Sequence, residues 1–260
     1  MAEPFLRIYG SSDWCPTPGN DGSCYLLDDR ILIDTGWRGV THLIDDEIDP
    51  LQAPTMLFTH LHPDHRLALP QLIMYWRIKK YTLAGLTVAG PAERIQTLYD
   101  HAFDYVFHDV ADWRTEVAEQ ARVLPLAPGD AFETPEHRVE VADACHGTPA
   151  RMYRITHRMS GHTIGFTGDT TYFDGLGEFF RGVDALVCEC TLADIPKEKA
   201  AHGTTNHMNL WEVADVARKA QPQQLILTHT TKNRARALEL IRPLVDCDVF
   251  WAEPGDMVLY

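Results

Sequence analysis

His60, His62, Asp64 and His65 lie within six residues of one another, directly after the apolar run 55–58. We expect that run to be a buried strand, with the polar cluster at its end. His60 and His62 are two residues apart, so in extended chain their side chains point to the same side. The proline turn that follows carries Asp64 and His65 toward a neighbouring point. Imidazole nitrogens and carboxylate oxygens are ligands of zinc-like ions, and this spacing suits two adjacent metal ions better than one.

The elements that must position these groups follow the same order in both parts of the chain, strands first and helices after them. The first part predicts strands at 5–9, 24–27, 31–33, 55–58 and 87–91, with helices at 41–47, 66–80, 91–110 and 113–121. Asp28 and Asp29 predict a tight hairpin turn between the second and third strands. The second part predicts strands within 138–146, 151–158, 162–169, 184–191, 224–230 and 248–260, with helices at 210–220 and 233–240. No linker separates the parts, so we expect one α/β domain, 1–260, with pseudo-symmetric halves of about 1–121 and 122–260.

The H-x-H-x-D-H string resembles the signature of the metallo-β-lactamase fold superfamily. The segment ILIDTG before it, and His146 in ACHGTP, Asp169 in FTGDTTYF and His229 in LILTHTT after it, are similar to the family's other motifs in their order. The resemblance implies a four-layer αββα sandwich. It also implies two divalent metal ions, zinc in the first place, with manganese or iron also accepted. One ion would bind His60, His62 and His146, the other Asp64, His65 and His229, and Asp169 would bridge them.

His162 competes with His146, because SGHTIGFTGD superficially resembles the Gly-His-Thr motif of the glyoxalase II branch. His162 stands seven residues before Asp169 on what is predicted to be one extended strand. At about 3.3 Å per residue the two would be roughly 23 Å apart, too far to share a centre. A hairpin through 151–169 instead returns Asp169 to the level of His146, so we favour His146. Asp169 by itself could also be a turn or helix-capping residue.

His207 is the one further histidine with a functional interpretation. It precedes the predicted helix 210–220, where a capping or surface role is the alternative. The segment from CECT through NHMNLWEVADVA to LILTHTT is similar to the C-terminal part of ribonuclease Z and its small phosphodiesterase relatives. The opening IYGSSDWCPTPG is similar to the same branch. In that branch a histidine before this helix serves in catalysis, and the resemblance implies that role for His207.

Two departures from ribonuclease Z argue against transfer-RNA processing. A basic, glycine-rich arm is typical of that enzyme, whereas here an acidic and aromatic stretch occupies 92–121. Thr231 and Asn233 stand where the family motif usually has Ser and Arg. The chain carries 37 acidic against 23 basic residues, a formal net charge of −14, which opposes binding of a long nucleic acid.

These features predict a metal-dependent hydrolase, and we expect a phosphodiesterase that cleaves a small phosphodiester or cyclic phosphate with a hydroxide between two metals. Asp64 would orient or deprotonate the attacking water, and His207 would protonate the leaving oxygen. A carbonyl hydrolase, such as a lactonase, thioesterase or β-lactamase-like enzyme, is the alternative, because the same hydroxide can attack a carbonyl. A tRNA 3′-processing endonuclease and an inactive metal-binding protein are further alternatives.

The composition of the chain leads to expectations about its compartment and its partners. The 260 residues contain no run of roughly 18 apolar residues, so we expect no membrane association. The six cysteines form no CxxC pair, which is typical of reduced thiols in the cytoplasm. The expected partner is a small, anionic substrate, and a homodimer is compatible with the sequence.

Overall fold

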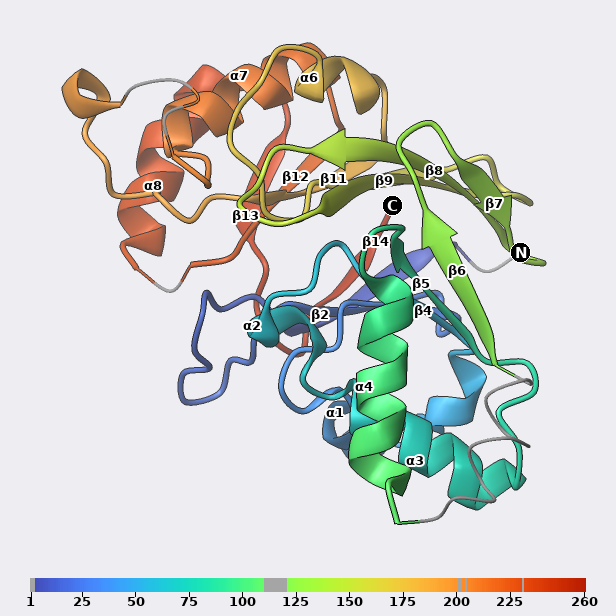
Figure 1. Ribbon diagram of the computed structural model, residues 1–260. Helices are drawn as coiled ribbons and strands as arrows, with labels where there is room; N and C mark the ends of the chain where they lie inside the picture. Colours follow the sequence, from blue (N-terminus) through green and yellow to red (C-terminus); the bar gives the residue numbers. More distant parts are fainter. Residues whose placement is uncertain (1–2, 110–120, 201–202, 204, 231) are drawn as a thin grey trace.

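The computed structural model describes residues 3–109, 121–200, 203, 205–230 and 232–260. Two seven-stranded sheets face each other, and helices cover both outer faces (Figure 1). The predicted αββα sandwich is therefore confirmed. Among the described residues, no helix is both long and apolar enough to span a lipid bilayer.

The first sheet carries the HxHxDH segment. Its strand order is β14-β1-β2-β3-β4-β5-β6, antiparallel from β14 to β3 and parallel from β3 to β6. The strands are β1 (Phe5–Gly10), β2 (Cys24–Leu27), β3 (Ile31–Ile33), β4 (Thr55–Leu57), β5 (Thr87–Pro91), β6 (Arg122–Leu126) and β14 (Met257–Leu259). The helices of this half are α1 (Gly39–Asp45), η1 (Pro50–Gln52), α2 (Pro63–Arg66), α3 (Leu69–Lys80) and α4 (Ile95–Phe107).

The second sheet has the order β13-β12-β11-β10-β9-β8-β7, antiparallel from β7 to β10 and parallel from β10 to β13. Its strands are β7 (Ala131–Glu133), β8 (His137–Ala144), β9 (Ala150–His157), β10 (Thr163–Phe166), β11 (Ala185–Glu189), β12 (Gln224–Thr228) and β13 (Asp248–Trp251). The helices of this half are α6 (Leu176–Phe179), η2 (Lys197–Lys199), α7 (Leu210–Ala220), α8 (Arg234–Ile241) and η3 (Arg242–Leu244).

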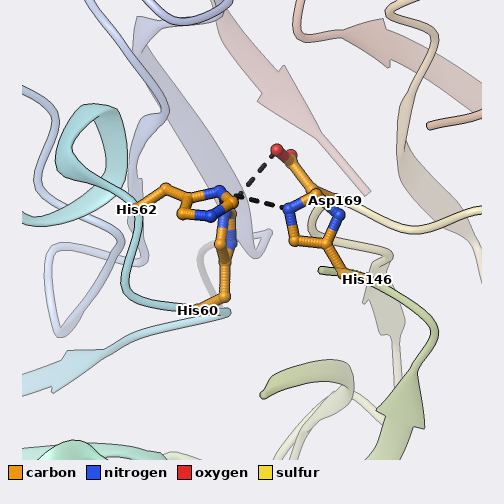
Figure 2. Close-up of side chains that lie close together, drawn as sticks. All are labelled: His60, His62, His146 and Asp169. Carbon is orange, nitrogen blue, oxygen red and sulfur yellow. Dashed lines mark hydrogen bonds and ion pairs between the residues drawn. The ribbon is translucent and has the colours of Figure 1, made fainter. Parts of the chain in front are cut away.

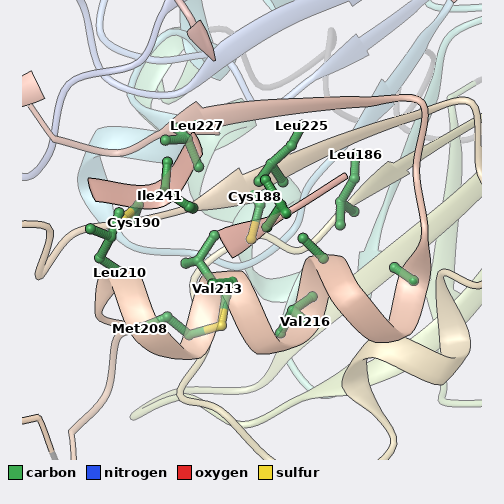
Figure 3. Close-up of a cluster of buried hydrophobic side chains, with 14 of the residues drawn as sticks. Leu186, Cys188, Cys190, Met208, Leu210, Val213, Val216, Leu225, Leu227 and Ile241 are labelled. Carbon is green, nitrogen blue, oxygen red and sulfur yellow. The ribbon is translucent and has the colours of Figure 1, made fainter. Parts of the chain in front are cut away.

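Apolar side chains fill three layers, because each sheet is covered on both faces. Along β12, Ile226 belongs to the layer between the sheets, whereas Leu225 and Leu227 pack toward α7 on the outside (Figure 3). This alternation follows from the two-residue period of a strand. At the start of α7, Asn209 and Glu212 form a capping box, which fixes where the helix begins and so where the preceding loop with His207 ends.

The sheets do not divide the chain at residue 121. β6 lies after that boundary and yet pairs with β5 of the first sheet. The last predicted strand, 248–260, is two strands, and β14 leaves the second sheet to pair with β1. The first sheet is therefore completed by segments from the second part of the sequence.

The other predicted elements differ mainly at their ends. The helix expected over 66–80 is divided into α2 and α3, and the helix expected from residue 91 begins at Ile95, because β5 extends to Pro91. The helix predicted at 113–121 lies outside the described residues, except for its last residue, because the structure does not describe 110–120. The Asp28-Asp29 hairpin turn is confirmed: both residues have positive φ, 50° and 54°, and the backbone N–H of Arg30 donates to the carbonyl of Leu27 at 2.8 Å.

Candidate metal centre

The side chains expected to bind metal come together where strands of both sheets end. His60 and His62 follow β4, and α2 carries Asp64 and His65 directly after them. His146, Asp169 and His229 follow β8, β10 and β12, respectively. These three strands run in the same direction, so their carboxyl ends lie at one edge of the second sheet, a usual place for a site in α/β proteins.

The first group consists of His60, His62, His146 and Asp169, whose ligand atoms lie within 4.8 Å of one another (Figure 2). Nδ1 of His62 is 3.1 Å from Nε2 of His60 and 3.1 Å from Nε2 of His146. Nε2 of His60 is 3.6 Å from Oδ2 of Asp169. Three imidazole nitrogens and one carboxylate oxygen thus face a common point.

The outer hydrogen bonds determine which nitrogens face this point unprotonated. Nδ1 of His146 donates to the backbone carbonyl of Asn206 at 2.9 Å, which leaves Nε2 as a lone pair. Nδ1 of His60 lies 3.2 Å from the Thr59 hydroxyl, which itself donates to Asp34 at 2.7 Å and so accepts from the ring. Nδ1 of His62 therefore lies between two lone pairs and could donate a proton to only one. A cation at the common point satisfies all three nitrogens.

The second group consists of Asp64, His65 and His229, all buried. Nε2 of His229 is 3.3 Å from Oδ2 of Asp64, and Nε2 of His65 is 3.4 Å from the same oxygen. The Oδ1 atom of Asp64 is buried and has no hydrogen-bond partner among the described residues. An unsatisfied carboxylate oxygen is costly in the interior, so a polar species beside the three ligand groups, a cation or its bound water, is needed to offset that cost.

Asp169 lies between the two groups. Its Oδ1 is 3.6 Å from Nε2 of His65, and its Oδ2 is 3.3 Å from Nε2 of His229 and 3.6 Å from Nε2 of His60. Burial raises the pKa of Asp169, but the electrostatic interactions with the surrounding imidazoles, His229 and His65 first, outweigh it and hold the pKa well below its ordinary value. The donor set therefore fits two divalent cations, with one carboxylate in reach of both.

Further side chains orient the rings from outside. Asp34, at the end of β3, accepts from Nδ1 of His65 at 2.8 Å and from the backbone and hydroxyl of Thr59. Nδ1 of His229 contacts the Thr191 hydroxyl at 2.9 Å. Such partners fix the tautomer and direction of a ligating imidazole.

His207 stands at the edge of the centre, half-buried. Its Nδ1 lies 3.1 Å from Oε1 of Glu189 and 3.9 Å from Oδ2 of Asp169, and its ring stacks on that of His229 with centroids 5.5 Å apart. Burial lowers the pKa of His207, but the hydrogen bond and charge of Glu189 and the charge of Asp169 outweigh burial and raise the pKa to about 9. The two carboxylates therefore favour the protonated form of this imidazole.

Glu189 is a candidate functional residue that the sequence did not indicate. It is buried at the end of β11, between Cys188 and Cys190, which belong to the core. Its Oε1 accepts from the backbone N–H of Thr170 at 2.8 Å, and its Oε2 accepts from the Thr191 hydroxyl at 2.7 Å. A charged residue inside an apolar strand was the available signal, since carboxylates are rarely buried without a partner.

The competing histidine lies elsewhere. His162 precedes β10 at the end of that strand away from Asp169, and its side chain is 47% exposed and 3.6 Å from Asp184. It belongs to none of the groups that could hold a metal in the described parts of the chain. Of the two candidates, the fold brings His146 to the centre.

Comparisons with known proteins agree with this arrangement. The family described as "Beta-lactamase superfamily domain" matches residues 29–230. The uncharacterized protein Rv1339 of Mycobacterium tuberculosis is 29% identical over 231 residues, covering 86% of this chain and 80% of that protein. Ribonuclease Z of Anoxybacillus flavithermus is 26% identical over 275 aligned positions, covering 86% of both proteins.

Solved structures show the same fold. The metallo-β-lactamase fold protein YhfI from Bacillus subtilis superimposes with a TM-score of 0.80 at 19% identity, covering 99% of both chains. A diphosphatase of the PhnP family has a TM-score of 0.73 at 17% identity, covering 99% of this chain and 98% of its own. With the family match over most of its length and this fold, the chain belongs to the metallo-β-lactamase superfamily of metal-dependent hydrolases.

Proposed function

We propose that this protein is a phosphodiesterase that hydrolyses a small phosphodiester or cyclic phosphate at a dinuclear metal centre, with zinc as the first candidate metal. His60, His62 and His146 would hold one ion, Asp64, His65 and His229 the other, and Asp169 would contact both. When bound, such ions lower the pKa of a water molecule and neutralise charge on phosphate oxygens. The substrate class is argued from the protein's own groups beside the centre.

The observation that carries the proposal is the position of His207, which Glu189 holds at 3.1 Å and which lies 3.9 Å from Asp169. Phosphodiester cleavage needs a proton for the leaving oxygen and positive charge near the phosphate. Glu189 holds Nδ1 of His207 at 3.1 Å and keeps the ring charged, which leaves Nε2 to donate. His207 is thus suited to be the general acid of the reaction.

Asp64 supplies the complementary function. Its Oδ2 is directed at His65 and His229, while its Oδ1 is free of hydrogen-bond partners within the described structure. That second oxygen can accept a proton from the attacking water and orient it. One carboxylate would therefore both bind metal and act as the base.

A small substrate fits the charge of the protein. The formal charge of −14 repels a long polyanion, whereas a single phosphate responds mainly to the local cations of the centre. α4 and the turn before it occupy residues 92–107, where a ribonuclease Z arm would begin. These features favour a small anionic substrate over transfer RNA, although the relative from Anoxybacillus is named ribonuclease Z.

The test is hydrolysis by the metal-loaded protein of a substrate panel: cyclic nucleotides, an acyclic phosphodiester, a lactone and a β-lactam. We expect turnover of phosphodiesters, and a His207→Ala variant with unchanged metal content and kcat lower by on the order of 100-fold. Lactone or β-lactam turnover without phosphodiester turnover would identify the carbonyl hydrolase alternative and overturn the proposal.

A further inference from the structure

A large aromatic side chain stands at the edge of the candidate metal centre and has no part in the chemistry described above. The ring of Trp14 lies with its centroid 5.3 Å from that of His62, tilted by 33°, and the residue is 59% exposed. We propose that Trp14 is the stacking platform for the base of a nucleotide substrate whose phosphate lies at the metal centre. This inference rests on the proposed function and narrows its substrate class to nucleobase-bearing phosphodiesters.

The loop that presents Trp14 is held in place by hydrogen bonds on both sides of the residue. The backbone N–H of Ser11 donates to the Asn20 side chain at 2.9 Å, and that of Ser12 donates to the carbonyl of Asp21 at 2.9 Å. The Ser12 hydroxyl donates to the carbonyl of Cys15 at 2.7 Å, which closes a turn around Trp14 itself. A ring presented by such a turn loses little conformational freedom when a ligand stacks on it.

The base of the loop is packed closely. A Cβ atom on Gly10 would come within 1.9 Å of the carbonyl oxygen of Gly22, and one on Gly22 would come within 2.3 Å of the carbonyl oxygen of Asp64. The two ends of the loop are thereby pressed against each other and against α2, which carries Asp64. The position of Trp14 is tied to the position of the centre.

The geometry matches the layout of a nucleotide. His62 faces the common point of the first group with Nδ1, and its ring contacts Trp14. Trp14 is therefore one imidazole ring away from the common point that the first group faces, where a metal would bind the phosphate. In a nucleotide, the sugar separates the phosphate from the base in a similar way. Stacking on an aromatic side chain contributes about 1–3 kcal/mol per base and tolerates any base, because each has a π-face.

Shielding of His62 is the competing explanation for Trp14. A side chain that only covered His62 would itself be expected to be largely buried, as tryptophans that pack in the core are: Trp76 of α3 is 4% exposed. Trp14 keeps most of its surface in solvent. Trp37 offers a matched control: it is 37% exposed as well, but it lines a groove between α3 and α4 with Pro70, Met74 and Tyr105.

The experiment measures binding by calorimetry to the zinc-loaded protein of two ligands that share a phosphate, adenosine 5′-monophosphate and ribose 5-phosphate. The wild type should bind the nucleotide at least tenfold more tightly. Trp14→Ala should weaken nucleotide binding about tenfold and leave ribose 5-phosphate binding unchanged. Trp14→Phe should retain most of the affinity, and Trp37→Ala all of it.

Three results would overturn the inference: equal affinity of the wild type for the two ligands, wild-type nucleotide affinity in Trp14→Ala, or an equal loss for both ligands in that variant. The last would mean that Trp14 acts only through His62 and the metals. Hydrolysis of the substrate panel by the wild type is measured in parallel. Lack of phosphodiester turnover would count against the proposed function alone, because the binding comparison needs no catalysis.

Discussion

His207 donates from Nδ1 to Oε1 of Glu189 across 3.1 Å, and Glu189 is buried at the end of a central strand. The other carboxylate oxygen of Glu189 accepts from the Thr191 hydroxyl, which also contacts Nδ1 of His229 at 2.9 Å. One buried carboxylate thus positions the candidate acid directly and a candidate metal ligand through a hydroxyl.

Replacement of Glu189 by Gln tests its role in keeping His207 protonated. The amide keeps the shape of the side chain but removes the charge that holds His207 protonated, so kcat should fall on the order of 100-fold, about as far as in His207→Ala. The double variant should be no slower than either single variant, because both remove the same function. Kinetics combined with metal analysis checks this, and additive losses in the double variant would show that the two residues act independently.

Asp34 and Asp28 allow a matched test of orientation around the metals. Each accepts from a buried histidine, Asp34 from His65 at 2.8 Å and Asp28 from His137 at 2.7 Å, but only His65 belongs to the candidate centre. Asp34→Asn should weaken metal binding about 10-fold to 100-fold. Asp28→Asn should leave it unchanged. Competition with a chromogenic chelator measures both, and equal affinities in the two variants would contradict a role for Asp34 in holding His65.

The choice between His146 and His162 can be checked by counting metals. His146→Ala removes one of three nitrogens that face a common point, so the variant should retain fewer metal ions per chain than the wild type after dialysis. His162→Ala changes an exposed side chain and should retain the wild-type number. Elemental analysis of the purified variants gives the answer. A loss in His162→Ala with none in His146→Ala would refute the assignment.

Asp21 should make stability depend on pH. Its buried carboxylate accepts from the backbone of Gly22, Trp37 and Arg38 and from His42. Burial raises its pKa, but the hydrogen bond from His42 and those from the backbone outweigh burial and lower the pKa below 3.8. A lowered pKa in the folded state means that the stabilisation is complete above the unfolded pKa and is lost as the pH falls through the folded pKa.

Asp21→Asn should therefore lower the free energy of unfolding by about 2 kcal/mol at pH 7, since charged hydrogen bonds are replaced by neutral ones and the oxygen that faces His42 becomes an amide. The difference from wild type should shrink as the pH falls below about 4. Urea unfolding at a series of pH values from 7 to 3 measures this. A difference that stays constant over the range would exclude the carboxylate charge as its cause.

The local part of the site was readable from the sequence. His60, His62, Asp64 and His65 follow one another within a strand end and a single helical turn, so their mutual arrangement depends on backbone geometry over a few residues. The apolar strands were readable too, since strands covered on both faces need almost continuous apolar residues. His146 could be preferred over His162 because the rise per residue of a strand gives the distance between two residues on it. That distance separates His162 from Asp169, whereas a hairpin brings Asp169 back to the level of His146.

The tertiary structure decided the contacts between distant residues. Pairing of Glu189 with His207 depends on how β11 lies beside the start of α7, and the contact of Trp14 with His62 depends on how the 11–22 loop packs on α2. β14 returns to the first sheet because β1 offers an unpaired edge there, and no local pattern in residues 248–260 encodes that choice. Spacing along the chain determines which donors share an element, but only the packing of the two sheets determines which of them meet.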